Sequence, residues 1–310
     1  SSLNSKSVNI RSAYCVQNFN VTLPLIQTID VSQPCPTALT TCNGGMAPGE
    51  EKKIYSGVVA LTPCSDWIIN WNTCCRNGAI TNIVNPAANS VYIQNTLNNV
   101  IGSNNNSPKF FNEPTAYLNN NDLTIYSHGA YDVDGDSLYF SKATPLTMPG
   151  PPGVPVAFSP GYSQIMPIIS SNGFNLNPVS GDMCFTPSVS QTAVIATLIS
   201  EFRNGILIGT QLREFEIFTS PSNGNNAPDH GNLPVCGQTG TSNIISAGPS
   251  VSQVDSNSFE MCPGDNVCFE IYPSDPNGDN INIMSNIGIT IPGAMLTVVN
   301  NNTPNPVVTV

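Results

Sequence analysis

The chain has 310 residues, of which 40% are hydrophobic and only 9% are charged. The hydrophobic share is sufficient for packed cores and argues against a disordered chain. With 9 basic and 20 acidic residues the formal charge is −11, so nucleic acid and anionic lipid would be repelled and cations would be favoured. We expect no nucleic-acid partner, and no direct membrane insertion, because no apolar run reaches spanning length.

Ten cysteines indicate an oxidising compartment. They form no CxxC pair, and the two histidines, His128 and His230, would give zinc few ligands. Structural disulfides are therefore the better interpretation. Neither histidine has a nucleophile nearby in sequence, so we expect both on the surface or in turns. No signal peptide opens the chain and its last residues resemble a strand, so we expect an internal fragment of a longer secreted protein.

Short alternating runs predict an all-β fold. Helical periodicity is nearly absent, and 27 prolines and 24 glycines interrupt the sequence every few residues. Between them lie runs rich in β-branched and aromatic residues, at 54–61, at 193–218 around an Asn204-Gly205 turn, and at 267–272. Many short strands between regularly spaced turns predict β-sandwich domains.

The cysteines and tryptophans of the first hundred residues give two further predictions. We expect Cys35 with Cys42, and later Cys262 with Cys268, to form local disulfides, and Cys64 to pair with an unassigned partner. If Cys74 and Cys75 lie in a strand they point to opposite faces and take different partners; a redox-active vicinal pair is the alternative. Trp67 and Trp71 share a strand face and either pack in a core or form a stacking platform for glycan.

Two similar linkers divide the chain. Asn104-Asn105-Asn106-Ser107-Pro108 and Asn225-Asn226-Ala227-Pro228 both place polar residues before a proline, which disfavours deep pairing into a sheet. They predict a Cys-rich domain over 1–106, a second domain over 107–226 and a third over 227–310. An internal repeat supports this division, because residues 122–140 match 265–283 at a constant offset.

The repeat carries the strongest motif for metal binding. Asp132, Asp134 and Asp136 alternate around Gly135, which is a pattern that can surround calcium with oxygen ligands. Three linker-side residues, Glu113, Asn104 and Asn106, are predicted to complete the shell. The weaker second site consists of Asp275, Asn277 and Asp279. The alternative interpretation is a β-turn whose carboxylates accept hydrogen bonds from backbone amides.

Motifs typical of catalysis are missing from the sequence. It contains no Gly-x-Ser-x-Gly elbow, no glycine-rich phosphate loop and no His-Glu-x-x-His. A pair of carboxylates for glycoside hydrolysis is not excluded, because its members can lie far apart in the chain. We predict that the protein is not an enzyme.

Several short sequence segments, taken together, resemble the giant cell-surface adhesins of Bacteroidetes, which are related to the gliding adhesin SprB. The resemblance covers most of residues 55–283, and its most specific blocks are Cys74-Cys75-Arg76-Asn77 and Asp132-Val133-Asp134-Gly135-Asp136-Ser137-Leu138. The other matching phrases lie at residues 63–67, 80–82, 107–110, 185–187, 201–205 and 213–214.

The resemblance implies immunoglobulin-like or cadherin-like modules in a row, type IX secretion, and display outside the outer membrane with a role in adhesion or gliding motility. It implies no active site. The partners would be other modules of the same long chain and a surface or glycan ligand. Cadherin joints carry acidic linker residues where this chain has asparagine. The resemblance therefore gives less support to a full calcium cluster than the motif of Asp132, Asp134 and Asp136 gives. The alternatives are a carbohydrate-binding module, a secreted hydrolase and the subunit of a fibre that polymerises by strand exchange.

Overall fold

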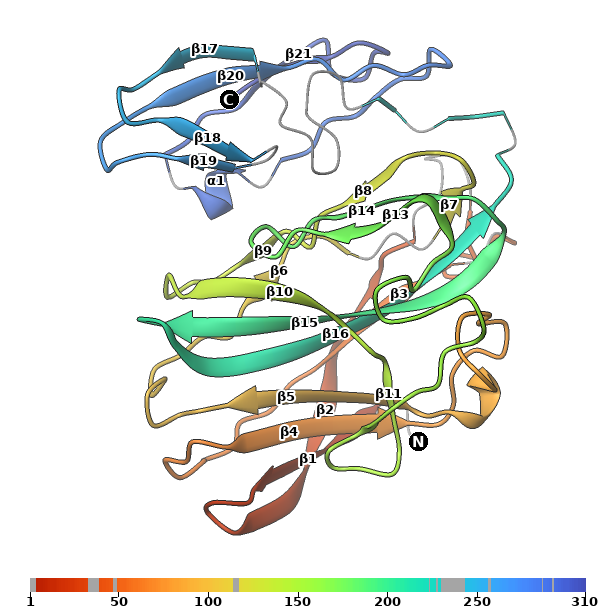
Figure 1. The fold of residues 1–310 in the computed structure, drawn as a ribbon, viewed down its shortest axis with the longest axis vertical. Helices are drawn as coiled ribbons and strands as arrows, with labels where there is room; N and C mark the ends of the chain where they lie inside the picture. The colour runs from red at the N-terminus through yellow and green to blue at the C-terminus, as the bar shows by residue number, and fades with distance from the viewer. Residues whose placement is uncertain are drawn as a thin grey trace.

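The computed structural model describes residues 4–32, 39–46, 49–113, 117–222, 224–226, 228–229, 243–255, 258–285, 287–291 and 293–310 (Figure 1). In these residues the regular structure is nearly all β, with a 3-10 turn η1 (Pro86–Ala88) and a short helix α1 (Ile287–Thr290). The predicted all-β class is confirmed. None of the described helices is long and apolar enough to span a membrane.

The largest sheet follows the order β10-β15-β16-β5-β4-β1-β2-β3. In chain order these strands are β1 (Ser5–Ser12), β2 (Gln17–Asp30), β3 (Glu51–Tyr55), β4 (Trp67–Thr73), β5 (Val91–Leu97), β10 (Ser137–Ala143), β15 (Gln191–Arg203) and β16 (Ile206–Ser220). Three short strands join it at the side: β7 (Tyr117–Asn119), β11 (Leu146–Thr147) and β12 (Val154–Pro155).

This sheet crosses the domain boundary predicted at residue 106. β5, from the Cys-rich segment, is antiparallel to β16, with Gly209 opposite Leu97 and Gln211 opposite Asn95. The first two predicted domains therefore share one sheet and are not separated by the linker. Pairing between strands that lie a hundred residues apart leaves no local signal in the sequence, and this is why the linker was misleading.

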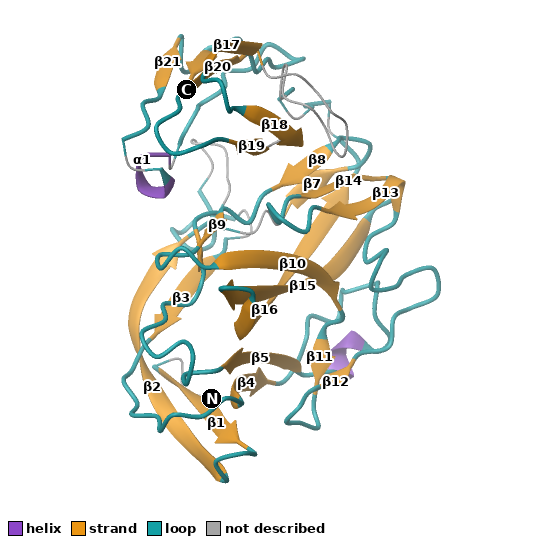
Figure 2. Cartoon of the chain, turned by 60° about the vertical axis from the view of Figure 1, so that its left-hand side comes forward, coloured by secondary structure: helices purple, strands orange, loops and turns teal. Residues whose placement is uncertain are grey.

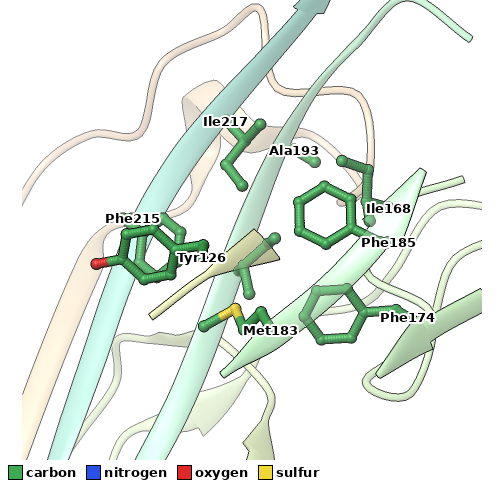
Figure 3. Close-up of a cluster of buried hydrophobic side chains, with 9 residues drawn as sticks. Tyr126, Ile168, Phe174, Met183, Phe185, Ala193, Phe215 and Ile217 are labelled. Atoms are coloured by element: carbon green, nitrogen blue, oxygen red, sulfur yellow. The ribbon is translucent and has the colours of Figure 1, made fainter. Parts of the chain in front are cut away.

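A smaller sheet packs against the β15–β16 hairpin and makes a sandwich. It consists of β13 (Ser170–Leu176), β14 (Met183–Pro187) and β8 (Thr124–Tyr126). Figure 3 shows the core between the two layers, in which Ala193 on β15 and Phe215 and Ile217 on β16 point at the smaller sheet. Ile195 on β15 belongs to the same buried cluster. Burial of each large apolar side chain stabilises the fold by roughly 1.5 to 3 kcal/mol.

The hairpin turn follows the sequence prediction. Asn204 and Gly205 both have positive φ, 52° and 78°, as a two-residue turn of type I′ requires. Nearby, β6 (Lys109–Phe110) pairs with β9 (Ala130–Tyr131) and leads into the loop of residues 132–136.

The strands after residue 227 belong to other sheets. One has the order β17-β20-β22-β21, formed by β17 (Asn243–Ala247), β20 (Val267–Ile271), β22 (Val307–Thr309) and β21 (Thr297–Val299). A second consists of β18 (Ser252–Asp255) and β19 (Ser258–Glu260). Within the described ranges, none of these strands pairs with a strand that precedes residue 222, and Figures 1 and 2 show them at the upper end of the molecule.

The disulfides differ from the predicted ones. Cys64 pairs with Cys15, 49 residues away. Cys74 and Cys75 are bonded to each other, so the expectation of separate partners is wrong. The reason is that β4 ends at Thr73, and the alternation of side chains along a strand does not extend to these two residues. Cys184 is also disulfide-bonded.

The two local disulfides that the spacing suggested are absent. Cys42, Cys262 and Cys268 are free thiols, and Cys35 lies outside the described residues. Cys268 lies in β20 opposite Ser246. The backbone N–H of Cys262 donates instead to Ser250 Oγ, so the backbone of Cys262 is positioned by a different segment from that of Cys268.

Trp67 lies in a core, and the two tryptophans do not form a shared platform. Trp67 is fully buried, donates from its indole N–H to the Thr62 carbonyl at 3.1 Å and meets Phe19 edge-on at 6.4 Å. Trp71 lies half-buried on the same strand, with the Lys6 ammonium 5.5 Å from its ring centre. A shared glycan platform is therefore wrong, because one of its two rings is inaccessible.

His128 is also buried, against the prediction of a surface position. It has no exposed area, stacks on Phe140 at 5.7 Å and faces the Arg213 guanidinium, whose Nη1 lies 2.8 Å from its Nδ1. Burial and the charge of Arg213 lower its pKa to about 3. His230 lies outside the described residues.

Candidate functional site

The loop of residues 132–136, here called the Asp132 loop, is closed by its first carboxylate. Oδ1 of Asp132 accepts hydrogen bonds from the backbone N–H groups of Asp134 at 2.9 Å and Asp136 at 3.0 Å. Gly135 has φ of +81° and no atom within 4 Å of where a Cβ would be, so the need for glycine is conformational rather than steric. This is the turn that the alternative interpretation predicted, and it leaves Oδ2 of Asp132 without a hydrogen bond.

The preceding linker is fastened to this loop. Asn106 donates its backbone N–H to Oδ2 of Asp134 at 2.5 Å and its side-chain amide to Oδ1 at 2.9 Å. These bonds hold the pKa of Asp134 below its ordinary value. The chain that enters the 107–226 segment is therefore positioned by hydrogen bonds to the carboxylate of Asp134, 28 residues further along.

Arg203, at the end of β15, also binds the loop. Its Nε donates to Oδ1 of Asp136 at 2.9 Å and its Nη2 to Oδ2 at 2.6 Å, which is the two-pronged geometry of a strong guanidinium–carboxylate pair. The same Nη2 also donates to Oδ1 of Asn105 at 2.8 Å. Arg203 thus connects the linker, the loop and the β15–β16 hairpin.

Glu201 adds a buried carboxylate two residues before Arg203. It is only 2% exposed, and burial together with the charges of Asp132 and Asp136 raises its pKa to about 7, although a hydrogen bond from Asn105 at 2.6 Å opposes the rise. Gly209 faces it across a register shift of the hairpin, and a Cβ there would approach Oε2 of Glu201 to 3.2 Å. Glycine at 209 therefore leaves room for this carboxylate.

Asp132, Asp136 and Glu201 bring one carboxylate oxygen each within 4.8 Å of the others. Oδ2 of Asp132 is buried and receives no hydrogen bond, although a buried carboxylate oxygen is costly without a partner. The four carboxylates of the cluster, counting Asp134, and the one guanidinium leave a formal charge of −3 when all are ionised. An all-oxygen, anionic donor set with an unpartnered oxygen fits a hard divalent cation such as calcium.

The structure changes the predicted ligand set. Glu113 forms an ion pair with Lys52 and is not in the cluster, and Asn104 is exposed, while its neighbour Asn105 makes the contacts. Glu201 was missed, because its sequence context is an ordinary hairpin strand. Only the antiparallel pairing of β10 with β15, which sets Glu201 opposite Leu138, brings it to the Asp132 loop.

The second predicted site repeats the loop without the cluster. In the loop of residues 275–279, the Asp275 loop, Oδ1 of Asp275 accepts from the N–H groups of Asn277 at 2.8 Å and Asp279 at 3.0 Å. Asn277 accepts from the N–H of Asn226 at 2.7 Å and donates to the Gly224 carbonyl at 3.0 Å. In the part of the chain that the structure describes, carboxylates converge as a possible metal site only around Asp132.

The fold and the site therefore define an all-β protein with a carboxylate cluster where a linker meets a loop. No protein-family model matches the chain, and neither the curated proteins nor the solved structures contain a significant match to it.

Proposed function

We propose that the chain is an extracellular structural and adhesive segment built from β-sandwich modules in a row, in which the residues before the Asp132 loop and before the Asp275 loop are fixed to those loops. The observation that carries the proposal is that the same fastening occurs twice. Asn106 is held by Asp134 of the Asp132 loop, and Asn226 is held by Asn277 of the Asp275 loop, each through a backbone N–H. Fixed connections of this kind suit a chain that spaces a binding surface, because they limit the flexibility of the residues between packed elements.

In this proposal calcium binds at Asp132, Asp136 and Glu201 and acts structurally. Bound calcium would take the unpartnered Oδ2 of Asp132 and the carboxylate of Glu201, and it would hold β15 against the loop that contacts the linker. Arg203 shares Asp136 with the cation and limits the charge of the site. The low charge content and the disulfides favour the extracellular location.

The calcium part is tested by thermal unfolding with calcium or with excess chelator. Calcium is expected to raise the melting temperature of the wild-type chain, and Glu201→Gln is expected to abolish that rise. Glu113→Gln is the matched control, since Glu113 pairs with Lys52 away from the cluster. A melting curve that excess chelator leaves unchanged, or an equal loss of response in both variants, would contradict calcium binding at this site.

The location and adhesive role are tested on cells that produce the protein. Antibodies against residues 132–136 and protease added to intact cells should both reach the chain, and cells that lack it should adhere less to surfaces. A chain that resists protease until the cells are lysed would overturn the extracellular assignment. Neither result depends on the calcium experiment.

A further inference from the structure

Strand β2 has a free edge along its first half. Among the described strands, only β1 and β3 pair with β2. β1 lies along the whole stretch from Gln17 to Pro24, whereas β3 pairs only with the residues from Leu25 to Asp30. In the part of the chain that the structure describes, one side of residues 17–24 therefore has no neighbouring strand.

The register with β1 shows which backbone groups point to that side. The N–H of Leu25 donates to the carbonyl of Asn4 at 2.9 Å, so the odd-numbered residues of β2 bond to β1 and the even-numbered residues point away from it. Pro24, which has no N–H, fits this phase, and its carbonyl accepts from the N–H of Ser56 at 3.2 Å. The residues whose backbone N–H and C=O groups face the free edge are thus Asn18, Asn20 and Thr22.

This edge lacks the charges that the outer strands of the sheet carry. β10 contains Lys142, and β3 contains Glu51, Lys52 and Lys53. By contrast, residues 12–29, which include nearly all of β2, contain no charged side chain. Charged side chains on an edge strand, lysine above all, oppose its pairing with another chain. The first half of β2 is therefore an edge without this protection.

The side chains of this stretch suit a second copy of the same strand. Asn18, Asn20 and Thr22 are exposed and uncharged, and Phe19 and Val21, on the other face, are half-buried beside the core formed by the first strands. An antiparallel pair centred on Asn20 places Asn18 opposite Thr22 of the second copy and Phe19 opposite Val21 of the second copy. Polar side chains then meet on one face and apolar side chains on the other, and no like charges oppose each other.

We propose that the first half of β2 is a self-association edge, at which two copies of the chain pair antiparallel about Asn20 and join their sheets. This register allows Asn18, Asn20 and Thr22 of both copies to exchange backbone hydrogen bonds across the edge. The same patch serves both copies, so the interface has two-fold symmetry and closes at a dimer. The inference concerns a different surface from the calcium cluster and does not depend on the proposed function.

The proposal is tested by sedimentation equilibrium of the chain from micromolar to millimolar concentration. A single copy has a mass of 32.8 kDa, and the wild type is expected to approach twice this mass as concentration rises. Asn20→Lys and Asn20→Asp each place two like charges directly opposite one another, and each variant alone is expected to associate at least tenfold more weakly. An equimolar mixture of the two variants is expected to recover the dimer, because an ammonium group then faces a carboxylate.

The matched control is Asn72→Lys. Asn72 is exposed on β4 and pairs with Tyr92 inside the sheet, so this variant adds the same charge away from the edge and should associate like the wild type. A wild type that keeps the mass of one copy throughout the concentration range, or a dimer that Asn20→Lys leaves intact, would overturn the proposal. A mixture of the two Asn20 variants that associates no better than either alone would contradict pairing about Asn20.

Discussion

Arg76 and Glu214 form a buried ion pair across 138 residues of sequence. The guanidinium bonds both carboxylate oxygens, with Nη2 to Oε2 at 3.1 Å, and Nη2 also donates to the Leu146 carbonyl at 2.7 Å. The side chains are only 1% and 6% exposed. Burial raises the pKa of Glu214, and the hydrogen bond and charge of the Arg76 guanidinium partly oppose this rise. The pair joins the Cys-Cys-Arg-Asn block to β16 and ties the N-terminal segment to the central hairpin.

Removal of one member of this pair should destabilise the fold strongly. Arg76→Met leaves the Glu214 carboxylate buried without its partner, and the free energy of unfolding is expected to fall by about 3 to 5 kcal/mol. Urea unfolding measures this change. The pair of Lys53 and Glu51, which is largely accessible to solvent at 27% and 43% side-chain exposure, serves as the control, and Lys53→Met should cost less than about 1 kcal/mol. Equal losses from the two variants would show that Arg76 contributes no more than a surface charge.

His128 should make stability depend on pH below neutrality. Its pKa is about 3 in the folded chain against 6.5 ordinarily, so between these values the unfolded state binds a proton that the folded state does not. Stability from this group is thus present above pH 6.5 and lost as pH falls toward 3. The loss is about 1.4 kcal/mol per pH unit at most.

The matching measurement is urea unfolding between pH 4 and 6 in the wild type and in His128→Gln. An amide keeps an acceptor for Arg213 and does not titrate, and the remaining acidic groups are common to both proteins. The difference in free energy of unfolding should therefore shrink as pH falls. Parallel pH profiles would contradict a neutral, buried His128.

Asn82 should be indispensable to the packing of the segment before β5. It is fully buried, donates its amide to the carbonyls of Pro167 and Val194, both at 2.8 Å, and accepts from the Val194 N–H at 3.0 Å. Asn82→Ala leaves three backbone groups unpaired, at about 1 to 3 kcal/mol each, and should lower the melting temperature markedly. Asn77→Ala is the control, since Asn77 is exposed, and should have a small effect.

Substitution of the two tryptophans should lower the stability by different amounts. Trp67→Ala opens a cavity beside Phe19 and Ile10 in a closed core, and a loss of about 3 to 5 kcal/mol is expected. Trp71→Ala removes a half-buried ring under Lys6 and should cost much less. Comparable losses would place both rings in the core and would contradict the burial pattern of β4.

The sequence alone determined the features that depend on residues close together in the chain. Alternation and turn residues fixed the all-β class, Asn204-Gly205 fixed the hairpin, and the offset between the Asp132 and Asp275 loops identified two copies of one turn whose hydrogen bonds agree within about 0.1 Å. These features depend on backbone preferences of residues that are neighbours in the chain. They appear in any conformation that keeps the local segment intact.

Tertiary structure decided what depends on pairing between distant strands. β5 lies beside β16 only because a sheet can continue through strands from any part of a chain, so the linker at residue 106 does not separate two cores. Glu201 reaches Asp132 only through the register of β10 and β15, and Arg76 reaches Glu214 only once β16 is in place. Such contacts are selected by burial of apolar surface over the whole molecule, a quantity that no local window of sequence contains.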